Sequence, residues 1–159
     1  MPASRRGEWE HLLKIEDDRK KRTMLEEYLD RGIGECFLHD PRVAGIAEAA
    51  MLQFHYKRYE LLAWCVMPNH IHDLVHVWDW PLWKMVQNWK VRVENQRRKL
   101  FLMQREYWDT FMRVEAQEKT AIRYIENNPV KAKLCQCSGD WPFSSARCRD
   151  NFRRLILLQ

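Results

Sequence analysis

Two apolar runs flank the dipeptide Pro68-Asn69 near the middle of the chain. The first, YELLAWCVM at 59–67, is apolar on both faces after Glu60, a pattern typical of a strand covered on each side. The second, HIHDLVHVW at 70–78, is also of the β type and follows the Pro-Asn break at once. Two such runs joined by a short turn predict an antiparallel hairpin.

Helical patterns precede this hairpin. Apolar positions among dense charges predict one or two helical segments at 8–31, stopped by two glycines. Residues 34–38 are either a short strand or an extended link. Asp40-Pro41 then places a helix N-cap before a proline at the first helical position, which predicts a helix reaching about Phe54.

Two further helices are expected after the hairpin. One begins near Pro81, with an apolar stripe that includes Trp89 and a basic opposite face. The other covers 115–127 and ends before Pro129, because the residue preceding proline avoids the helical region. No repeat, low-complexity tract or linker divides the chain. We therefore expect one α+β domain over 1–159, with a helical extension at 1–31 and a basic tail at 139–159.

Composition narrows the class of protein. Hydrophobic residues make up 46% of the 159 residues and charged residues 31%, which is ordinary for a globular domain. No apolar run approaches the roughly 18 residues that a membrane helix needs, and the N-terminus carries no apolar signal region. Five scattered cysteines, an odd number, favour reduced thiols over a disulfide framework. These features predict a cytoplasmic protein without a membrane partner.

Positive charge is concentrated in one stretch. The formal charge of the chain is +5, whereas residues 81–105 hold seven basic side chains against one acidic, a net of +6. Such a stretch is the footprint expected of a protein that binds the phosphate backbone of nucleic acid, although a merely solvated basic helix has the same composition. The candidate DNA-binding residues are Lys84, Lys90, Arg92, Arg97, Arg98, Lys99 and Arg105. Arginines of the basic tail are further candidates.

His70 and His72 are candidate metal ligands. Residues i and i+2 of a strand project from the same face, so the two imidazoles point the same way and suit one divalent cation. His76 lies too far along the strand, roughly 13 Å from His72, to share that cation. An HxH pair is weak evidence alone, and two structural histidines remain the alternative.

Tyr124 and Asn128 form the second candidate group. One helical turn separates them, so they share a face of the predicted helix. A tyrosine phenol can act as a covalent nucleophile, and an amide oxygen beside it can ligate a metal. Each residue also has an ordinary interpretation: Tyr124 as a packing side chain, and Asn128 as a helix-end residue before proline.

Several motifs occur together in a recognisable order: VMPNHIH, then WK, QREYWD, RYIENNPVKA and DWPFSSAR. In this order they resemble the transposases associated with repetitive extragenic palindromes (REP), a group of single-tyrosine HUH transposases. The resemblance covers about 28–149. It implies a ferredoxin-like antiparallel sheet with helices packed on one side. It also implies His70 and His72 as the metal pair, Asn128 as third ligand and Tyr124 as the nucleophile.

The resemblance further implies an activity. A bound Mg²⁺ or Mn²⁺ would assist attack by tyrosine on single-stranded DNA, at hairpin-forming palindromic repeats, through a 5′-phosphotyrosine link. Imidazole ligands would also suit Zn²⁺. Relatives act as monomers or dimers, so a homodimer is compatible with the resemblance. Within the motifs we expect Trp89 in the core, Lys90 on phosphate, and Trp141 and Phe143 packed on the body.

The chain departs from the family pattern at several points. Members generally begin with an additional β-strand, whereas this chain begins with charged helical sequence. We expect this helical segment to cover the sheet. Any self-association would occur through an exposed sheet edge. Asp73 stands at a usually apolar position, opposite the histidines, and Lys133 replaces a glycine. Leu102-Met103 stands where the family tends to have Phe-Trp. Two alternatives remain: a truncated, inactive relative that retains only DNA binding, and an unrelated metal-binding α+β protein.

Overall fold

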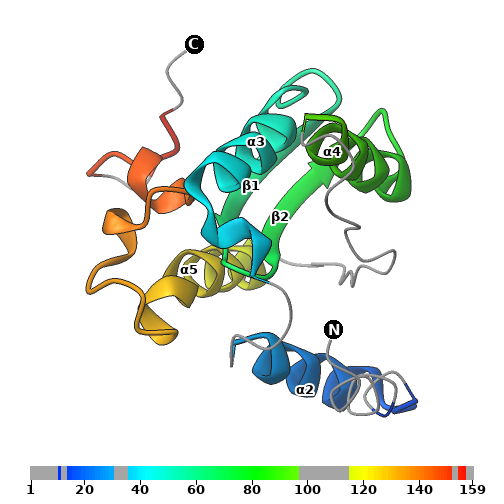
Figure 1. The fold of residues 1–159 in the computed structure, drawn as a ribbon, viewed down its shortest axis with the longest axis vertical. Coiled ribbons are helices and arrows are strands. Elements are labelled where there is room, and N and C mark those ends of the chain that lie inside the picture. Colours follow the sequence, from blue (N-terminus) through cyan, green and yellow to red (C-terminus); the bar gives the residue numbers. More distant parts are fainter. Residues whose placement is uncertain (1–10, 12–13, 31–35, 97–114, 152–153, 157–159) are drawn as a thin grey trace.

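The computed structural model describes residues 11, 14–30, 36–96, 115–151 and 154–156 of the chain. The elements in chain order are α2 (Asp18–Asp30), η1 (Phe37–His39), α3 (Pro41–Leu52), β1 (Tyr59–Val66), β2 (Ile71–Val77), α4 (Leu82–Gln96), α5 (Glu115–Lys131), η2 (Ser138–Asp140) and η3 (Ser145–Cys148). Antiparallel strands combined with helices confirm the expected α+β class (Figure 1).

The predicted hairpin forms the sheet. β1 pairs antiparallel with β2, and Cys65 lies opposite His72. The register shifts between Leu61 and Ala63, so one additional residue bulges from β1. A bulge exchanges the faces of the residues that follow it. In the part of the chain that the structure describes, the sheet has these two strands, and the family's additional first strand has no counterpart there.

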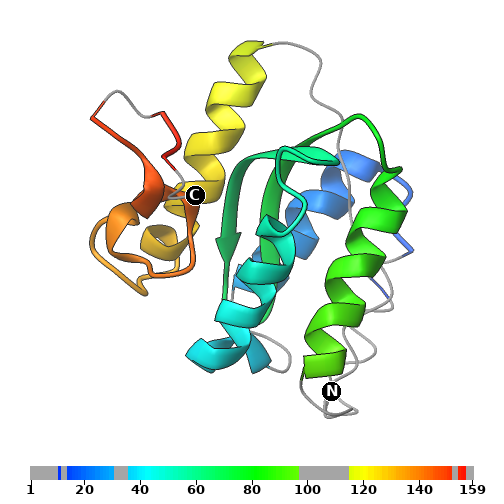
Figure 2. The ribbon, with the colours of Figure 1, turned by 90° about the horizontal axis from the view of Figure 1, so that it is seen from above.

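Helices cover both faces of the sheet. α3 and α4 pack on one face and on each other, as Figure 2 shows from above. α5 packs against β1 and β2 from the opposite face. The expectation of helices on one side therefore holds for α3 and α4, and α5 adds a second layer. The bulge explains this double cover, because β1 beyond it is buried on both faces.

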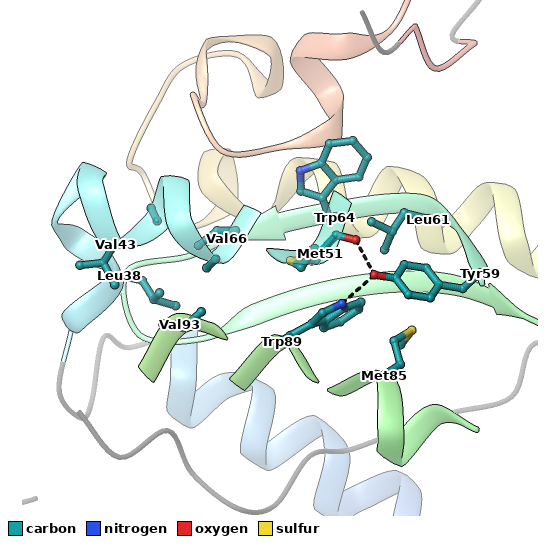
Figure 3. Close-up of a cluster of buried hydrophobic side chains, with 12 residues drawn as sticks. Leu38, Val43, Met51, Tyr59, Leu61, Trp64, Val66, Met85, Trp89 and Val93 are labelled. Atoms are coloured by element: carbon teal, nitrogen blue, oxygen red, sulfur yellow. Dashed lines mark hydrogen bonds between the residues drawn. The ribbon is translucent and has the colours of Figure 1, made fainter. Parts of the chain in front are cut away.

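Buried hydrogen bonds order the core between β1, α3 and α4 (Figure 3). The Tyr59 hydroxyl donates to the Met51 carbonyl at 2.7 Å and accepts from Trp89 Nε1 at 2.8 Å. Burial raises the pKa of the Tyr59 phenol, which keeps its proton available for donation. Trp89, only 7% exposed, is a core residue as predicted.

The tail packs on the body as predicted. Trp141 Nε1 donates to the Val66 carbonyl at 2.9 Å, and the Trp141 ring joins the cluster under α5. Phe143 joins the cluster between the sheet and α3 and α4. The Trp141 indole is partly buried, and its N–H meets its hydrogen-bond requirement within the protein.

Two element ends differ from the sequence-based expectation. Residues 37–39 form a 3₁₀ turn rather than a strand. α5 continues through Pro129 to Lys131. Pro129 lacks the N–H of a normal helical residue, yet it is buried, as are Ile125 and Asn128. Tertiary packing therefore holds the helix through a position where local preference alone would end it.

The helical character expected within 8–31 is confirmed for α2, but its position over the sheet is not. Leu25 and Tyr28 are buried in a cluster separate from the two that face the sheet. α2 meets the hairpin at its turn, where Asn69 Nδ2 donates to the Leu29 carbonyl at 2.9 Å. The amphipathic pattern of a helix fixes which side is apolar and leaves its partner undetermined.

None of the helices that the structure describes has the length and apolar character needed to cross a membrane. All five cysteines lie in the described part of the chain, and none is paired with another.

Candidate functional site

The two histidines meet at the turn end of β2. His70 Nε2 lies 2.8 Å from His72 Nε2, and the two ring planes are close to perpendicular. Both rings are partly buried. The expected projection of His70 and His72 from one face is therefore observed, with their Nε2 atoms directed at one another. Such convergence is what a shared cation needs.

Asn69 orients the first of these rings. Its Oδ1 lies 2.7 Å from His70 Nδ1, and an amide oxygen can only accept, so Nδ1 carries the proton. The His70 Nε2 lone pair then faces His72. Burial, and secondarily the neighbouring His72, lowers the pKa of His70 to about 3, so the ring is neutral at physiological pH. A neutral imidazole with its other nitrogen fixed by a hydrogen bond is the usual state of a metal ligand.

α5 brings Tyr124 to the histidine pair. The Tyr124 ring lies edge-on to His72, with centroids 5.9 Å apart. Asn128, one turn later, is 1% exposed, and its Nδ2 donates to the Tyr124 carbonyl at 3.0 Å. Its Oδ1 is buried without a hydrogen-bond partner among the described residues. A buried amide oxygen without a partner is costly, and a cation would satisfy it.

The donor set fits a divalent metal that also takes ligands from a substrate. Among the residues that the structure describes, no three His, Cys, Asp or Glu side chains form a metal cage. Two imidazoles and one amide oxygen are available instead, and all are neutral. A site of this kind leaves the positive charge of a cation for an anionic substrate such as phosphate.

An open depression of about 350 Å³ lies beside the tyrosine, lined by Thr120, Arg123, Tyr124, Asn127 and Lys131. Lys131 Nζ is 5.7 Å from the Tyr124 ring centroid. Two cations and no carboxylate line this depression, so it suits an anionic ligand. Sequence reasoning missed Arg123 and Lys131. Lys131 follows Tyr124 by seven residues, about two helical turns, and that spacing was the signal for it. Arg123 directly precedes Tyr124, and spacing gives no such signal for an adjacent residue.

Three of the basic residues predicted to bind DNA lie on a different element, α4. Lys84 of α4 is exposed, with Nζ 5.3 Å from the Trp80 ring, and Lys90 is half-buried. Arg92 lies over the Phe54 ring at 5.6 Å. Four candidates fall outside the described residues: Arg97, Arg98, Lys99 and Arg105. The sheet separates α4, which carries Lys84, Lys90 and Arg92, from α5, which carries Tyr124 (Figure 2).

Two arginines of the tail, which were expected to contact DNA, form ion pairs with buried glutamates. Arg147 binds Glu48 of α3, and Arg149 binds Glu126 of α5. Both glutamates are buried, and an unpaired carboxylate in such surroundings would be costly. Each arginine therefore neutralises a buried carboxylate; the Arg149 side chain is itself enclosed, whereas that of Arg147 is 35% exposed. Arg154 pairs with Asp150 at 2.8 Å, and Arg153 lies outside the described residues.

Comparisons with known proteins find relatives of the kind that the sequence motifs resemble. A protein of Haemophilus influenzae named as a REP-associated tyrosine transposase is 27% identical over 112 residues, spanning 57% of this chain and 60% of that protein. A solved REP-associated tyrosine transposase bound to a REP hairpin aligns with a TM-score of 0.60. The chain is similar to REP-associated tyrosine transposases.

This similarity has a defined extent. The chain spans less than two thirds of the curated relative's length. The solved transposase is 20% identical, with 72% of this chain and 70% of that chain covered, so the shared property is the fold. No family model matches the sequence. The arrangement of His70, His72, Tyr124 and Asn128 therefore has to be argued from this chain's own geometry.

Proposed function

We propose that this chain is a metal-dependent endonuclease and strand transferase for single-stranded DNA, acting at hairpin-forming palindromic repeats. The observation that carries the proposal is the position of Tyr124 against the histidine pair, 5.9 Å between the Tyr124 and His72 ring centroids. The REP hairpin bound by the solved relative supports hairpin DNA as the substrate class. The cationic depression beside Tyr124 supports a phosphate-bearing ligand.

In the proposed reaction the Tyr124 phenol oxygen attacks the scissile phosphorus. A 5′-phosphotyrosine bond forms while the bond from phosphorus to the 3′ oxygen breaks. The phenol proton passes to solvent, and the departing 3′ oxygen ends as a hydroxyl. Tyrosine has a reference pKa near 10, so its oxygen needs activation. The Lys131 ammonium, 5.7 Å from the Tyr124 ring centroid, places positive charge beside the ring, where an anionic phosphate would lie. Attack by the 3′-hydroxyl in the reverse direction rejoins DNA strands.

His70, His72 and Asn128 are the residues that we propose hold a divalent cation, either Mg²⁺ or Mn²⁺. Bound there, the cation would polarise the phosphate and stabilise negative charge in the transition state. Asn69 holds the His70 tautomer that this role requires. The hydrogen bond from Asn128 Nδ2 to the Tyr124 carbonyl leaves Oδ1 as the ligating atom.

A labelled panel of single-stranded hairpins, incubated with the protein and Mn²⁺, tests the proposal. We expect a covalent protein–DNA band on a denaturing gel, its loss on chelation, and its loss in His70→Ala and His72→Ala. Thermal unfolding of the two variants should show that both remain folded, because the rings are only partly buried. Hairpin binding without any adduct under Mn²⁺, Mg²⁺ or Zn²⁺ would overturn the proposal and favour a relative that binds DNA without cutting it.

A further inference from the structure

The tail covers the outer edge of β1. The Val66 N–H donates to the Phe143 carbonyl at 2.9 Å, and the Trp64 N–H donates to Ser145 Oγ at 3.1 Å. Arg149 Nη2 donates to the Leu62 carbonyl at 2.7 Å. These β1 groups point away from β2 and would otherwise form an open sheet edge. Residues 143–149 therefore take the place of a neighbouring strand.

From that edge two arginine–glutamate pairs reach the two faces of the sheet. Arg147 forms a two-pronged contact with Glu48 of α3, with N–O distances of 3.1 and 2.9 Å. Arg149 Nε binds Glu126 Oε1 of α5. The second pair is the more enclosed, because the side chains of Arg149 and Glu126 are 9% and 1% exposed, against 35% and 9% for Arg147 and Glu48.

Ser145 joins the second pair to the sheet. Its hydroxyl lies 2.7 Å from Glu126 Oε1 and also accepts from the Trp64 N–H. Glu126 is thus held by Arg149 and Ser145, and each of these residues is bonded to the β1 backbone. A buried ion pair generally adds little net stability over apolar residues of similar volume. Directional hydrogen bonds to the β1 backbone nevertheless define the position of α5 on the sheet.

The helix held in this way carries the nucleophile. Glu126 lies two residues from both Tyr124 and Asn128, and β1 is hydrogen-bonded to the strand that bears His72. We propose that Glu126, Arg149 and Ser145 are positioning residues, which fix α5 on the sheet so that Tyr124 and Asn128 stand against the histidine pair. The expected effect of these residues on the reaction rate rests on the proposed function, in which Tyr124 is the nucleophile. A misplacement of about 1 Å at a reacting group lowers a rate by roughly 100-fold.

The test is a double substitution with a matched control. Glu126→Met combined with Arg149→Met removes both charges of the α5 pair and leaves no buried charge unpaired. Glu48→Met combined with Arg147→Met does the same on α3, which does not carry the nucleophile. Thermal unfolding and near-ultraviolet circular dichroism select the variants that fold. Ser145→Ala, which keeps both ion pairs, is the milder variant if the α5 double variant does not fold.

The first measurement needs no activity: the nuclear Overhauser contact between the Tyr124 and His72 rings. We expect it in the parent and in the α3 control, and we expect it lost or weakened in the α5 variant. The second measurement is the rate of adduct formation at saturating DNA and Mn²⁺. It should fall roughly 10- to 100-fold in the α5 variant, the effect usual for groups that orient ligands, and stay within about two-fold in the α3 control.

Two results would overturn the inference: a folded α5 variant that keeps the ring contact, or equal losses in the α5 and α3 variants. Failure of the proposed function would give a different result: the parent protein itself would form no adduct. In that case the nuclear Overhauser contact between the Tyr124 and His72 rings would still show whether Glu126 and Arg149 fix the position of α5.

Discussion

Tyr124 owes its candidate role to its neighbours. A tyrosine on a helix is commonly a packing residue, and the sequence alone left that interpretation open. The structure places its ring 5.9 Å from His72 and puts a lysine ammonium near it. Its ring also joins the cluster under α5, so one side chain both packs and faces the polar site.

Tyr124→Phe separates these two contributions. The substitution removes the attacking oxygen and keeps the ring, so we expect no covalent adduct and hairpin affinity within a few-fold of the parent. Denaturing gels measure the adduct, and fluorescence anisotropy measures the affinity. Tyr28→Phe, which changes a buried tyrosine in α2, is the matched control and should retain the adduct. A persistent adduct in Tyr124→Phe would mean that another residue is the nucleophile.

Asp73 shows the cost of a polar residue on the wrong face of β2. It follows His72 and therefore projects toward the α4 side, among the apolar side chains of Ile71 and Val75. Among the residues that the structure describes, Asp73 has no hydrogen bond or ion pair. Burial raises the pKa of its carboxyl to about 6. The shift is what a carboxyl group has at a position that the family usually fills with an apolar residue.

The raised pKa predicts how stability changes with pH. Because the folded state favours the protonated carboxyl, the favourable contribution is full below the unfolded pKa near 4 and is lost as pH rises through about 6. Asp73→Asn cannot ionise and should be about 1–2 kcal/mol more stable than the parent at pH 7, less than the full shift implies because the site is partly exposed. Urea unfolding at pH 4 and pH 7 measures the difference, and equal differences at the two pH values would contradict it.

At the scale of elements, local patterns predicted the hairpin and the helices best. Asp40-Pro41 does begin α3, with Asp40 Oδ1 accepting from the Arg42 N–H at 2.9 Å. The apolar stripe of α4 does bury Met85, Trp89 and Val93. These signals are local: the cap lies within one helical turn, and successive residues of the stripe are about one turn apart. Sequence reasoning failed at Pro129, a buried position through which α5 continues although local preference would end the helix there.

The end of α5 is also informative. Lys133 has a φ of 59°, the left-handed conformation, at the position where the family pattern has glycine. The Lys133 and Leu134 N–H groups donate back to the carbonyls of Val130 and Pro129, which is the Schellman arrangement. A side chain with a Cβ is strained in this conformation, whereas glycine is not. The lysine that replaces the family's glycine therefore stands at the left-handed C-cap position of α5.

Lys133→Gly should relieve this strain. We expect the free energy of unfolding to rise by about 0.5–1 kcal/mol, the relief of left-handed strain being partly offset by the greater freedom of glycine in the unfolded chain. Lys133→Ala removes the same charge and keeps the Cβ, so it should gain little. Chemical denaturation of the three proteins measures the difference. An equal gain in both variants would assign the effect to charge instead of backbone conformation.

At the scale of the whole molecule, the candidate site could be predicted only in part. His70, His72, Tyr124 and Asn128 were named from their spacing and from the family motifs, because each motif is local. The sheet and α5 bring three of them together, with the His72 ring against both His70 and Tyr124, and Asn128 is hydrogen-bonded to the Tyr124 carbonyl one turn later. Asn69, Glu126 and Arg149 act through contacts between segments far apart in the chain, and no spacing rule identifies such contacts. Arg149 was accordingly expected to bind DNA, and it binds Glu126 instead.

The distribution of positive charge over the molecule leads to the last prediction. The basic face of α4 and the depression beside Tyr124 lie on opposite sides of the sheet, so DNA that contacts both has to pass around one end of it. If the α4 stretch binds the DNA backbone, each phosphate that it neutralises releases about 0.7 counterions from a single strand. Replacing Lys90, Arg97 and Arg98 together by alanine should therefore reduce the slope of log affinity against log salt by about 2.

Fluorescence anisotropy with a hairpin oligonucleotide at several salt concentrations measures that slope. The control variant combines Arg42→Ala with Arg154→Ala, two exposed arginines that already pair with aspartates of their own. It should leave the slope unchanged, because the structure pairs each guanidinium with an aspartate; a reduced slope would instead support the sequence-based candidacy of Arg154, an arginine of the tail. An unchanged slope in the triple variant would remove α4 from the DNA path. The backbone would then be assigned to the other face, where Arg123 and Lys131 line the depression beside the tyrosine.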